Sequence, residues 1–175
     1  MVTNEERGAY LATEYLISLG HRRIDHISGP PGWLGTTARV RGWSAALSAA
    51  GLPSGSVVAG DWTTASGYEA GSRLGEAGGT AVFAANDQMA LGCIAAIVDS
   101  GRSVPGDISV VGFDDLPVAG YVLPALTTVR FDFAEVGRRA VDHILDLMAG
   151  RNPGPADSIE PVLIIRDSTQ AMTTS

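Results

Sequence analysis

The 175-residue chain is long enough for one ordinary domain, or for one domain and a fragment of another. Hydrophobic residues make up 45% of it and charged residues 18%, a balance that indicates a globular protein rather than a disordered one. The formal net charge of −7 is not the electrostatic footprint of a nucleic-acid binder. All twelve basic residues are arginine, which excludes a P-loop lysine and a Schiff-base lysine.

No apolar run is long enough to cross a bilayer, and the first residues lack the basic and apolar regions of a secretory signal. We therefore expect no membrane partner and a cytoplasmic protein. The single cysteine, Cys93, falls among small residues, so no disulfide framework is expected. Because His21, His26 and His143 have no partner at metal-ligand spacing, we expect no metal and no other cofactor.

Predicted helices and strands alternate along the chain. A capping box of Thr3 and Glu6 starts the first helix, which Gly20 ends. Further helices are expected to start near Thr36 or Thr37, near Thr63 or Thr64, after the N-cap Asn86, and at Asp132 with Glu135. Strands are expected at residues 24–27, 57–59, 81–85, 108–113, 127–131 and 161–165, the last at an edge. The alternation predicts an α/β fold, with a doubly wound, mostly parallel sheet flanked by helices.

Polar or aromatic residues follow each of the first four strands, where an open α/β sheet binds ligands. They include Arg39, Trp62, Asn86 and the pair Asp114-Asp115. Carboxylates accept hydroxyl protons, a guanidinium donates hydrogen bonds, a carboxamide does both, and an indole face suits the C–H side of a ring. A neutral polyol such as a sugar is therefore the expected ligand.

Each of these residues also has a purely structural interpretation. Asn86 suits a helix cap, and Asp87 suits the positive end of a helix dipole. The Asp114-Asp115 pair suits a solvated turn, Trp62 can cover the edge of the core, and Arg39 can be a solvated helix residue. Motifs typical of hydrolases, dinucleotide-binding proteins and zinc proteases are absent from the sequence, so we expect no enzyme.

An ordered set of motifs resembles the lactose/galactose-repressor family over nearly the whole chain. The motifs are Leu19-Gly20-His21-Arg22-Arg23-Ile24, Ser28-Gly29-Pro30, Arg39-Val40-Arg41-Gly42-Trp43, Gly60-Asp61-Trp62, the stretch from Ala85 to Gly92, the stretch from Val104 to Asp115, and Pro124-Ala125-Leu126-Thr127-Thr128-Val129. The resemblance implies the effector-sensing part of a transcriptional repressor, built like a periplasmic sugar-binding protein and lacking the DNA-binding helix-turn-helix.

The family architecture implies a division of the chain between two lobes. Residues 21–126 and 151–168 would form the C-terminal lobe, and residues 1–20 and 127–150 a remnant of the N-terminal lobe. The apolar faces of the first and last helices would then be exposed. Residues 169–175 are expected to be a disordered tail.

The resemblance also implies site residues and partners. Arg39, Asn86 and Asp114 would hydrogen-bond the hydroxyls of a sugar effector, Trp62 would stack on its ring, and Phe133 would approach it. A homodimer is expected, with operator DNA bound only through the missing domain. Two alternatives stay open: a stand-alone cytoplasmic sugar-binding protein, and an α/β enzyme that uses Asp114 or Asp115.

Overall fold

The structure is a computed structural model that describes residues 3–75, 78–152, 154 and 158–172. Helices and strands alternate along most of these ranges. In chain order they are α1 (Glu5–Ser18), β1 (Ile24–Ser28), α2 (Leu34–Ala49), β2 (Val57–Ala59), α3 (Thr64–Gly75), β3 (Ala81–Ala84), α4 (Asp87–Asp99), β4 (Ser109–Val111), the short 3-10 helix η1 (Pro117–Gly120), β5 (Thr128–Arg130), α5 (Phe133–Met148) and β6 (Val162–Ile164).

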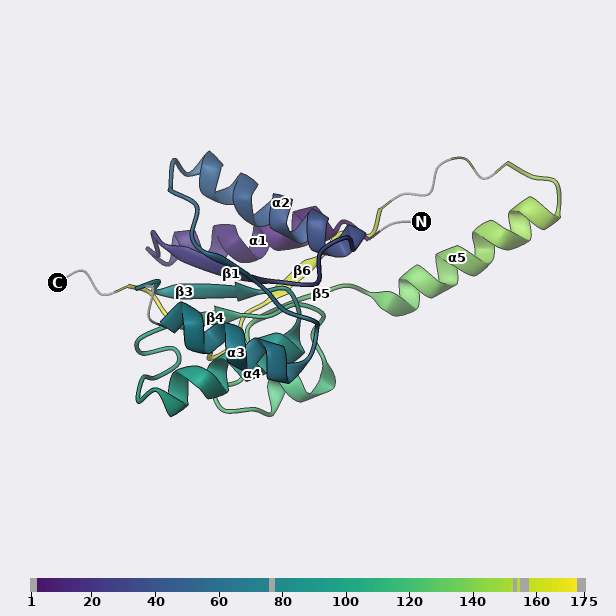
Figure 1. The fold of residues 1–175 in the computed structure, drawn as a ribbon. Helices are drawn as coiled ribbons and strands as arrows, with labels where there is room; N and C mark the ends of the chain where they lie inside the picture. Colours follow the sequence, from purple (N-terminus) through teal and green to yellow (C-terminus); the bar gives the residue numbers. More distant parts are fainter. Residues whose placement is uncertain (1–2, 76–77, 153, 155–157, 173–175) are drawn as a thin grey trace.

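Four strands form a parallel sheet in the order β2-β1-β3-β4, with α1 and α2 on one face and α3 and α4 on the other (Figure 1). The pairing puts Ile27 of β1 beside Val58 of β2 and Ala84 of β3. β5 and β6 form a separate antiparallel pair, joined to β4 by an isolated bridge between Val111 and Thr127. The prediction of a mostly parallel α/β sheet flanked by helices is confirmed.

Two apolar clusters fill the spaces between the sheet and its two helical layers. In the first cluster, Ile27 and Val82 of the sheet pack with Met89 and Ile97 of α4. In the second, Phe83 of β3 packs with Leu16 of α1 and Leu47 of α2. Because parallel strands covered on both faces bury every side chain, β1, β3 and β4 are buried along their whole length. The sheet is therefore a rigid base for the turns at its edges.

Three of the five predicted helix starts agree with the sequence, and two differ. α3 begins at Thr64 as expected, and the Thr63 hydroxyl accepts from the Ser66 N–H. Asn86 caps α4 by accepting from the Met89 backbone N–H, and Asp132 caps α5 in the same way. α1 is capped by Asn4 rather than by Thr3, whose hydroxyl donates to Glu5 instead. α2 starts at Leu34, earlier than predicted, with no side-chain cap. Its first turn thereby reaches the carboxyl edge of the sheet.

The expectation that the first helix exposes its apolar face is wrong. Ala9, Ala12 and Leu16 are fully buried, because α1 packs against α2 and contributes to the core beneath them. Gly42 makes this close approach possible, since a Cβ there would lie 2.1 Å from the Glu6 carbonyl oxygen. α1 thus packs in the same body as the four-stranded sheet. The division of a complete protein into two lobes stays a prediction.

The expectation of a disordered tail is also wrong for the described residues 169–172. The Thr169 hydroxyl lies 3.1 Å from that of Tyr15, and the Met172 N–H donates to the Leu19 carbonyl oxygen. Ser168, just before them, is fully buried and bonded to Val110. Residues 173–175 lie outside the described part.

α5 differs from the other helices because it extends away from the rest of the structure (Figure 1). None of its residues is buried, and most of its large apolar side chains, among them Ile144, Leu145 and Met148, are exposed, while Val136 is half-buried. The prediction of an exposed apolar face is confirmed for this helix. Across the described residues, no helix combines the length and the apolar character needed to span a membrane.

Candidate functional site

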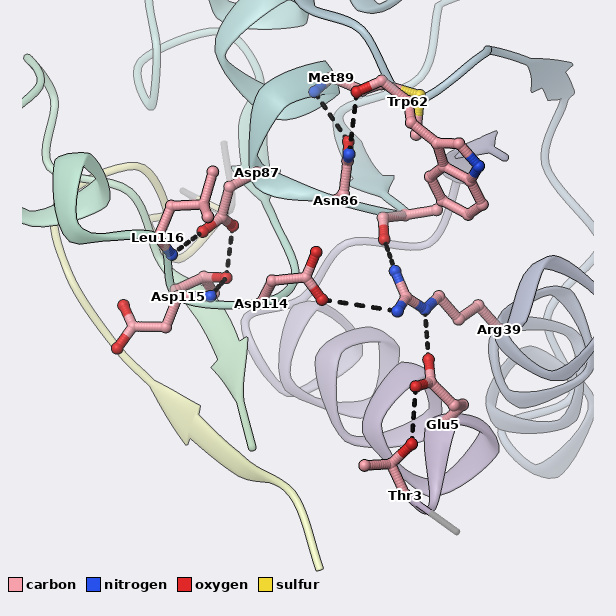
Figure 2. Close-up of polar contacts among 12 residues, drawn as sticks. Thr3, Glu5, Arg39, Trp62, Asn86, Asp87, Met89, Asp114, Asp115 and Leu116 are labelled. Atoms are coloured by element: carbon pink, nitrogen blue, oxygen red, sulfur yellow. Dashed lines mark hydrogen bonds and ion pairs between the residues drawn. The ribbon is translucent and has the colours of Figure 1, made fainter. Parts of the chain in front are cut away.

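A hollow of about 340 Å³ opens at the carboxyl edge of the four-stranded sheet. Its lining comes from α2, from the connection between β1 and α2, and from the turns after β2, β3 and β4, which meet there because parallel strands end at the same edge. Four of the five residues expected to bind an effector share this hollow with two others; its lining is Trp33, Gly35, Arg39, Trp62, Asn86 and Asp114. Figure 2 shows Arg39, Trp62, Asn86 and Asp114 converging there.

Arg39 is at the centre of this site. Its side chain is only 11% exposed, and its Nε lies 2.6 Å from a Glu5 carboxylate oxygen. Nη1 donates to the carbonyl oxygen of Ala85, and Nη2 lies 3.5 Å from Asp114 Oδ1 (Figure 2). These contacts exclude the interpretation of Arg39 as a solvated helix residue.

Aromatic rings flank the Arg39 guanidinium group. Its Cζ lies 3.9 Å from the centre of the Phe113 ring and 5.6 Å from that of Trp62, within cation–π range. Trp33 meets Trp62 edge-on, with the ring centres 6.2 Å apart. The hollow therefore combines indole surfaces with a fixed array of hydrogen-bonding groups.

Asn86 supports this edge of the sheet from both ends of its side chain. Oδ1 accepts from the Met89 N–H at 2.9 Å, and Nδ2 donates to the Trp62 carbonyl oxygen at 3.0 Å. The capping interpretation is thus confirmed, and the second bond holds the Trp62 backbone, which has a positive φ of 75°. Gly29 leaves room for the indole, since a Cβ there would lie 2.1 Å from it.

The Asp114-Asp115 pair forms a strained turn, with φ values of 103° and 51°. The two carboxylates point to different partners. Asp114 faces Arg39, whereas Asp115 forms an ion pair with Arg166 at 2.7 Å and another with Arg130 at 3.4 Å. This arrangement gives no support to an enzyme in which the two carboxylates act together.

Burial raises the pKa of Asp114 to about 6; nearby Arg39 opposes this increase, and Asp87 and Glu5 add to it. Burial likewise raises the pKa of Asp87 to about 6, against the hydrogen bonds that its carboxylate accepts. Those bonds come from the Thr128 hydroxyl at 2.6 Å and the Leu116 N–H at 2.7 Å. Asp87 therefore fixes the segment that follows Asp115, which is a larger role than the helix-dipole partner considered from the sequence.

Phe133 is not brought to the hollow. It is the first residue of α5, 56% exposed, and its ring centre lies 6.2 Å from that of Phe131. Its approach to an effector stays a prediction for a protein that contains a second lobe.

Two other groups considered from the sequence, His26 and Cys93, lie in the interior. His26 stacks on Phe83 and Trp43, and burial lowers its pKa to about 4. Cys93 is buried beside α3, which raises the pKa of its thiol to about 12. Within the described residues, His, Cys, Asp and Glu side chains form no group of three that could hold a metal ion.

Sequence reasoning missed Glu5 and Trp33. Glu5 lies 34 positions from Arg39, and only the packing of α1 on α2 brings the two together. Trp33 follows a Gly-Pro-Pro-Gly stretch whose path the sequence leaves open. No local pattern marks either residue as part of a site.

A family model described as a periplasmic binding protein-like domain matches residues 13–169. The chain belongs to this family. Among curated proteins it is similar to the lactose operon repressor of Escherichia coli K12, with 35% identity over 99% of this chain and 49% of the repressor. It is also 36% identical to the repressor PurR of Haemophilus influenzae PittEE, over 94% of this chain and 52% of PurR.

Solved structures that resemble this chain are also of transcriptional regulators. A crystal structure of the Lac repressor dimer bound to operator and the anti-inducer ONPF matches with a TM-score of 0.92 and 35% identity, covering 97% of this chain and 60% of that one. The complex of the transcriptional regulator CelR with cellobiose matches with a TM-score of 0.89 and 36% identity, covering 95% and 52%. The chain thus corresponds to about half the length of the curated repressors that it matches.

Proposed function

We propose that this chain is the effector-binding part of a cytoplasmic transcriptional regulator of the lactose/galactose-repressor type, and that it binds a sugar in the hollow around Arg39. The observation that carries the proposal is the convergence of Arg39, Asn86 and Asp114 beneath Trp62 at the carboxyl edge of the sheet. The complex of the similar regulator CelR with cellobiose supports the ligand class.

Each side chain has a role that suits a polyol. Arg39 donates to ring or hydroxyl oxygens, and Asp114 accepts from a hydroxyl. Trp62 offers an indole face to the C–H side of the ring. Asn86 uses both ends of its side chain within the protein, so its contribution is to hold the Trp62 backbone and the first turn of α4 in addition to any ligand contact. Phe133 joins from α5 when a second lobe closes over the hollow.

In the complete regulator, the sugar changes the affinity for operator DNA through a separate DNA-binding domain. The effector needs only to bind one arrangement of the two lobes better than the other. The correspondence to about half of the repressors' length supports such an arrangement, because it leaves room for a second lobe and a DNA-binding domain in a complete protein. The stand-alone sugar-binding protein and the α/β enzyme are not favoured, since the relatives are repressors.

We also propose a homodimer. Two surfaces of the described residues expose apolar groups: the face of α5 and the connection after η1, where Tyr121 and Leu123 are almost fully exposed. Light scattering of the purified chain tests this proposal. A dimer mass at micromolar concentration supports it, and a monodisperse monomer would contradict it.

The ligand proposal is tested by a thermal-shift screen of the chain against galactose, glucose, ribose, lactose and cellobiose, with a purine base as the other ligand class. A ligand that binds only the folded state raises the midpoint in proportion to its occupancy. We expect at least one sugar to raise it, and Trp62→Ala to abolish the shift. Tyr68→Ala is the matched control, because Tyr68 is an aromatic residue of α3 that lies outside the hollow and outside the two proposed dimer surfaces.

A shift that Trp62→Ala leaves intact would contradict the placement of the ligand. A shift with the purine base and with no sugar would contradict the ligand class.

A further inference from the structure

The positive charge of Arg39 is already paired within the protein. Glu5 lies 2.6 Å from its Nε and Asp114 lies 3.5 Å from its Nη2. The Ala85 carbonyl oxygen accepts from a third nitrogen, Nη1. Every nitrogen of the guanidinium group therefore has one oxygen partner, although N–H groups remain for a ligand.

Glu5 is held in this position from its other side. The Thr3 hydroxyl donates to Glu5 Oε1 at 2.9 Å, while Oε2 faces Arg39 (Figure 2). Glu5 stands in the first turn of α1, where the helix dipole favours a negative charge, and its side chain is only 20% exposed. The carboxylate is a fixed part of the site rather than a mobile surface group.

The charges around the hollow consequently favour an uncharged ligand. One guanidinium faces two carboxylates, so an incoming anion would meet net negative charge in a partly buried place. A pair of hydroxyls fits better. One accepts from a remaining N–H of Arg39, and its neighbour donates to the Asp114 oxygen that points away from Arg39 (Figure 2).

We infer that Glu5 sets the charge specificity of this site, so that it takes an uncharged polyol and rejects sugars that carry a phosphate or a carboxylate at the Arg39 end. The inference rests on the proposed function and deepens it, because it names the class of sugar and a residue that selects it. Glu5 acts through Arg39 and need not touch the ligand.

The first test uses inorganic phosphate as the probe and does not depend on which sugar binds. Tryptophan fluorescence reports on the hollow, since Trp33 and Trp62 line it. We expect no saturable change when phosphate is added to the wild-type chain at constant ionic strength. Glu5→Gln leaves one carboxylate beside Arg39, and we expect it to show saturable phosphate binding that the further change Arg39→Gln removes.

Glu6→Gln is the matched control. Glu6 is the next residue of α1 and pairs with Arg41 at 2.9 Å, but both side chains of this pair are exposed and neither lines the hollow. We expect this variant to behave like the wild type. Phosphate binding by the wild type as tight as that by Glu5→Gln would overturn the inference, and so would the absence of binding by a folded Glu5→Gln.

The second test compares sugars of matched shape and uses the unmodified chain, so it holds even where Glu5→Gln does not fold. Glucose and galactose are titrated beside glucuronate and galacturonate, which differ in carrying a carboxylate. We expect each binding neutral sugar to exceed its acid in affinity by about tenfold or more. Equal affinities for a neutral sugar and its acid would overturn the inference and leave the proposed function standing. If neither member of these pairs binds, and ribose, lactose and cellobiose do not bind either, the proposed function is contradicted.

Discussion

The edge of the sheet around Arg39 and the helix α5 differ in which side chains they bury and which they expose. Around Arg39, charged groups are largely buried, and each has partners in the protein. In α5, apolar residues are exposed and none is buried, while Arg138, Arg139 and Glu135 form ion pairs on the helix surface.

The difference shows that side-chain type does not decide burial by itself. Arg39 is buried because α1 and the turns after β3 and β4 supply its partners, and Ile144 of α5 is exposed because the described residues supply nothing that covers it. An apolar helix face is more stable when it is buried, but the surface that covers it has to come from another part of the protein. The two regions therefore predict different responses to substitution.

The largest expected effect comes from the same substitution placed in two helices. Ile97 of α4 is 1% exposed and Ile144 of α5 is 55% exposed. Ile97→Ala removes packed methylene groups and is expected to lower the free energy of unfolding by about 3 kcal/mol, whereas Ile144→Ala is expected to change it by less than about 0.5 kcal/mol. Urea denaturation at low protein concentration measures both values, and equal losses would show that α5 is covered in the free chain.

The next effect concerns Asp87, which is fully buried and fixes the segment after the Asp114-Asp115 turn. Asp87→Ala leaves the Leu116 N–H and the Thr128 hydroxyl without their acceptor, so we expect a loss of about 2 kcal/mol in the free energy of unfolding. The exposed Asp142 of α5 supplies the control, and Asp142→Ala is expected to have almost no effect on stability. An Asp87→Ala variant with an unchanged free energy of unfolding would contradict the conclusion that Asp87 fixes the segment after Asp115.

A smaller effect is the dependence of stability on pH. Burial raises the pKa of Asp87 from its ordinary value of 3.8 to about 6, so the folded chain binds a proton more tightly than the unfolded chain. The contribution of Asp87 to stability is therefore complete below about pH 4 and is lost as the pH rises through 6. Relative to Asp87→Asn, the wild type should gain about 1 kcal/mol between pH 7.5 and pH 5. A difference that stays constant with pH would refute this.

The smallest effect is expected at Phe133. Because this residue lies outside the hollow, Phe133→Ala should change the affinity of the chain for its sugar by less than about twofold. Titration of the two proteins with the same sugar measures the ratio. A larger loss would show that α5 approaches the site without a second lobe.

The repeating elements of the fold could be predicted from the sequence because their signals are local. Asn86 and Asp132 cap their helices as expected, and apolar runs mark the buried strands. The start of α2 was missed because no side chain caps it, and the packing of α1 was missed because its partner surface on α2 is distant in the chain. The tail contacts likewise depend on α1 and β4.

The site was predictable in outline for a topological reason. Residues that follow parallel strands meet at one edge, which brings Trp62, Asn86 and Asp114 together whatever the details of packing. The ion pair of Arg39 with Glu5 depends on the approach of two helices, so it leaves no mark in either segment alone. Phe133 was assigned by resemblance, and its position depends on a partner surface that the described residues do not contain.

The most direct test of the central claim is isothermal titration of the sugar that gives the largest thermal shift into the wild type, Asp114→Asn and Asp142→Asn. Both substitutions remove one negative charge, but only Asp114 lines the hollow. If the hollow binds the sugar, the wild type and Asp142→Asn should bind equally, and Asp114→Asn should bind about tenfold more weakly because it loses a charged hydrogen bond. Equal affinity of Asp114→Asn and the wild type would contradict the claim that this edge of the sheet is the effector site.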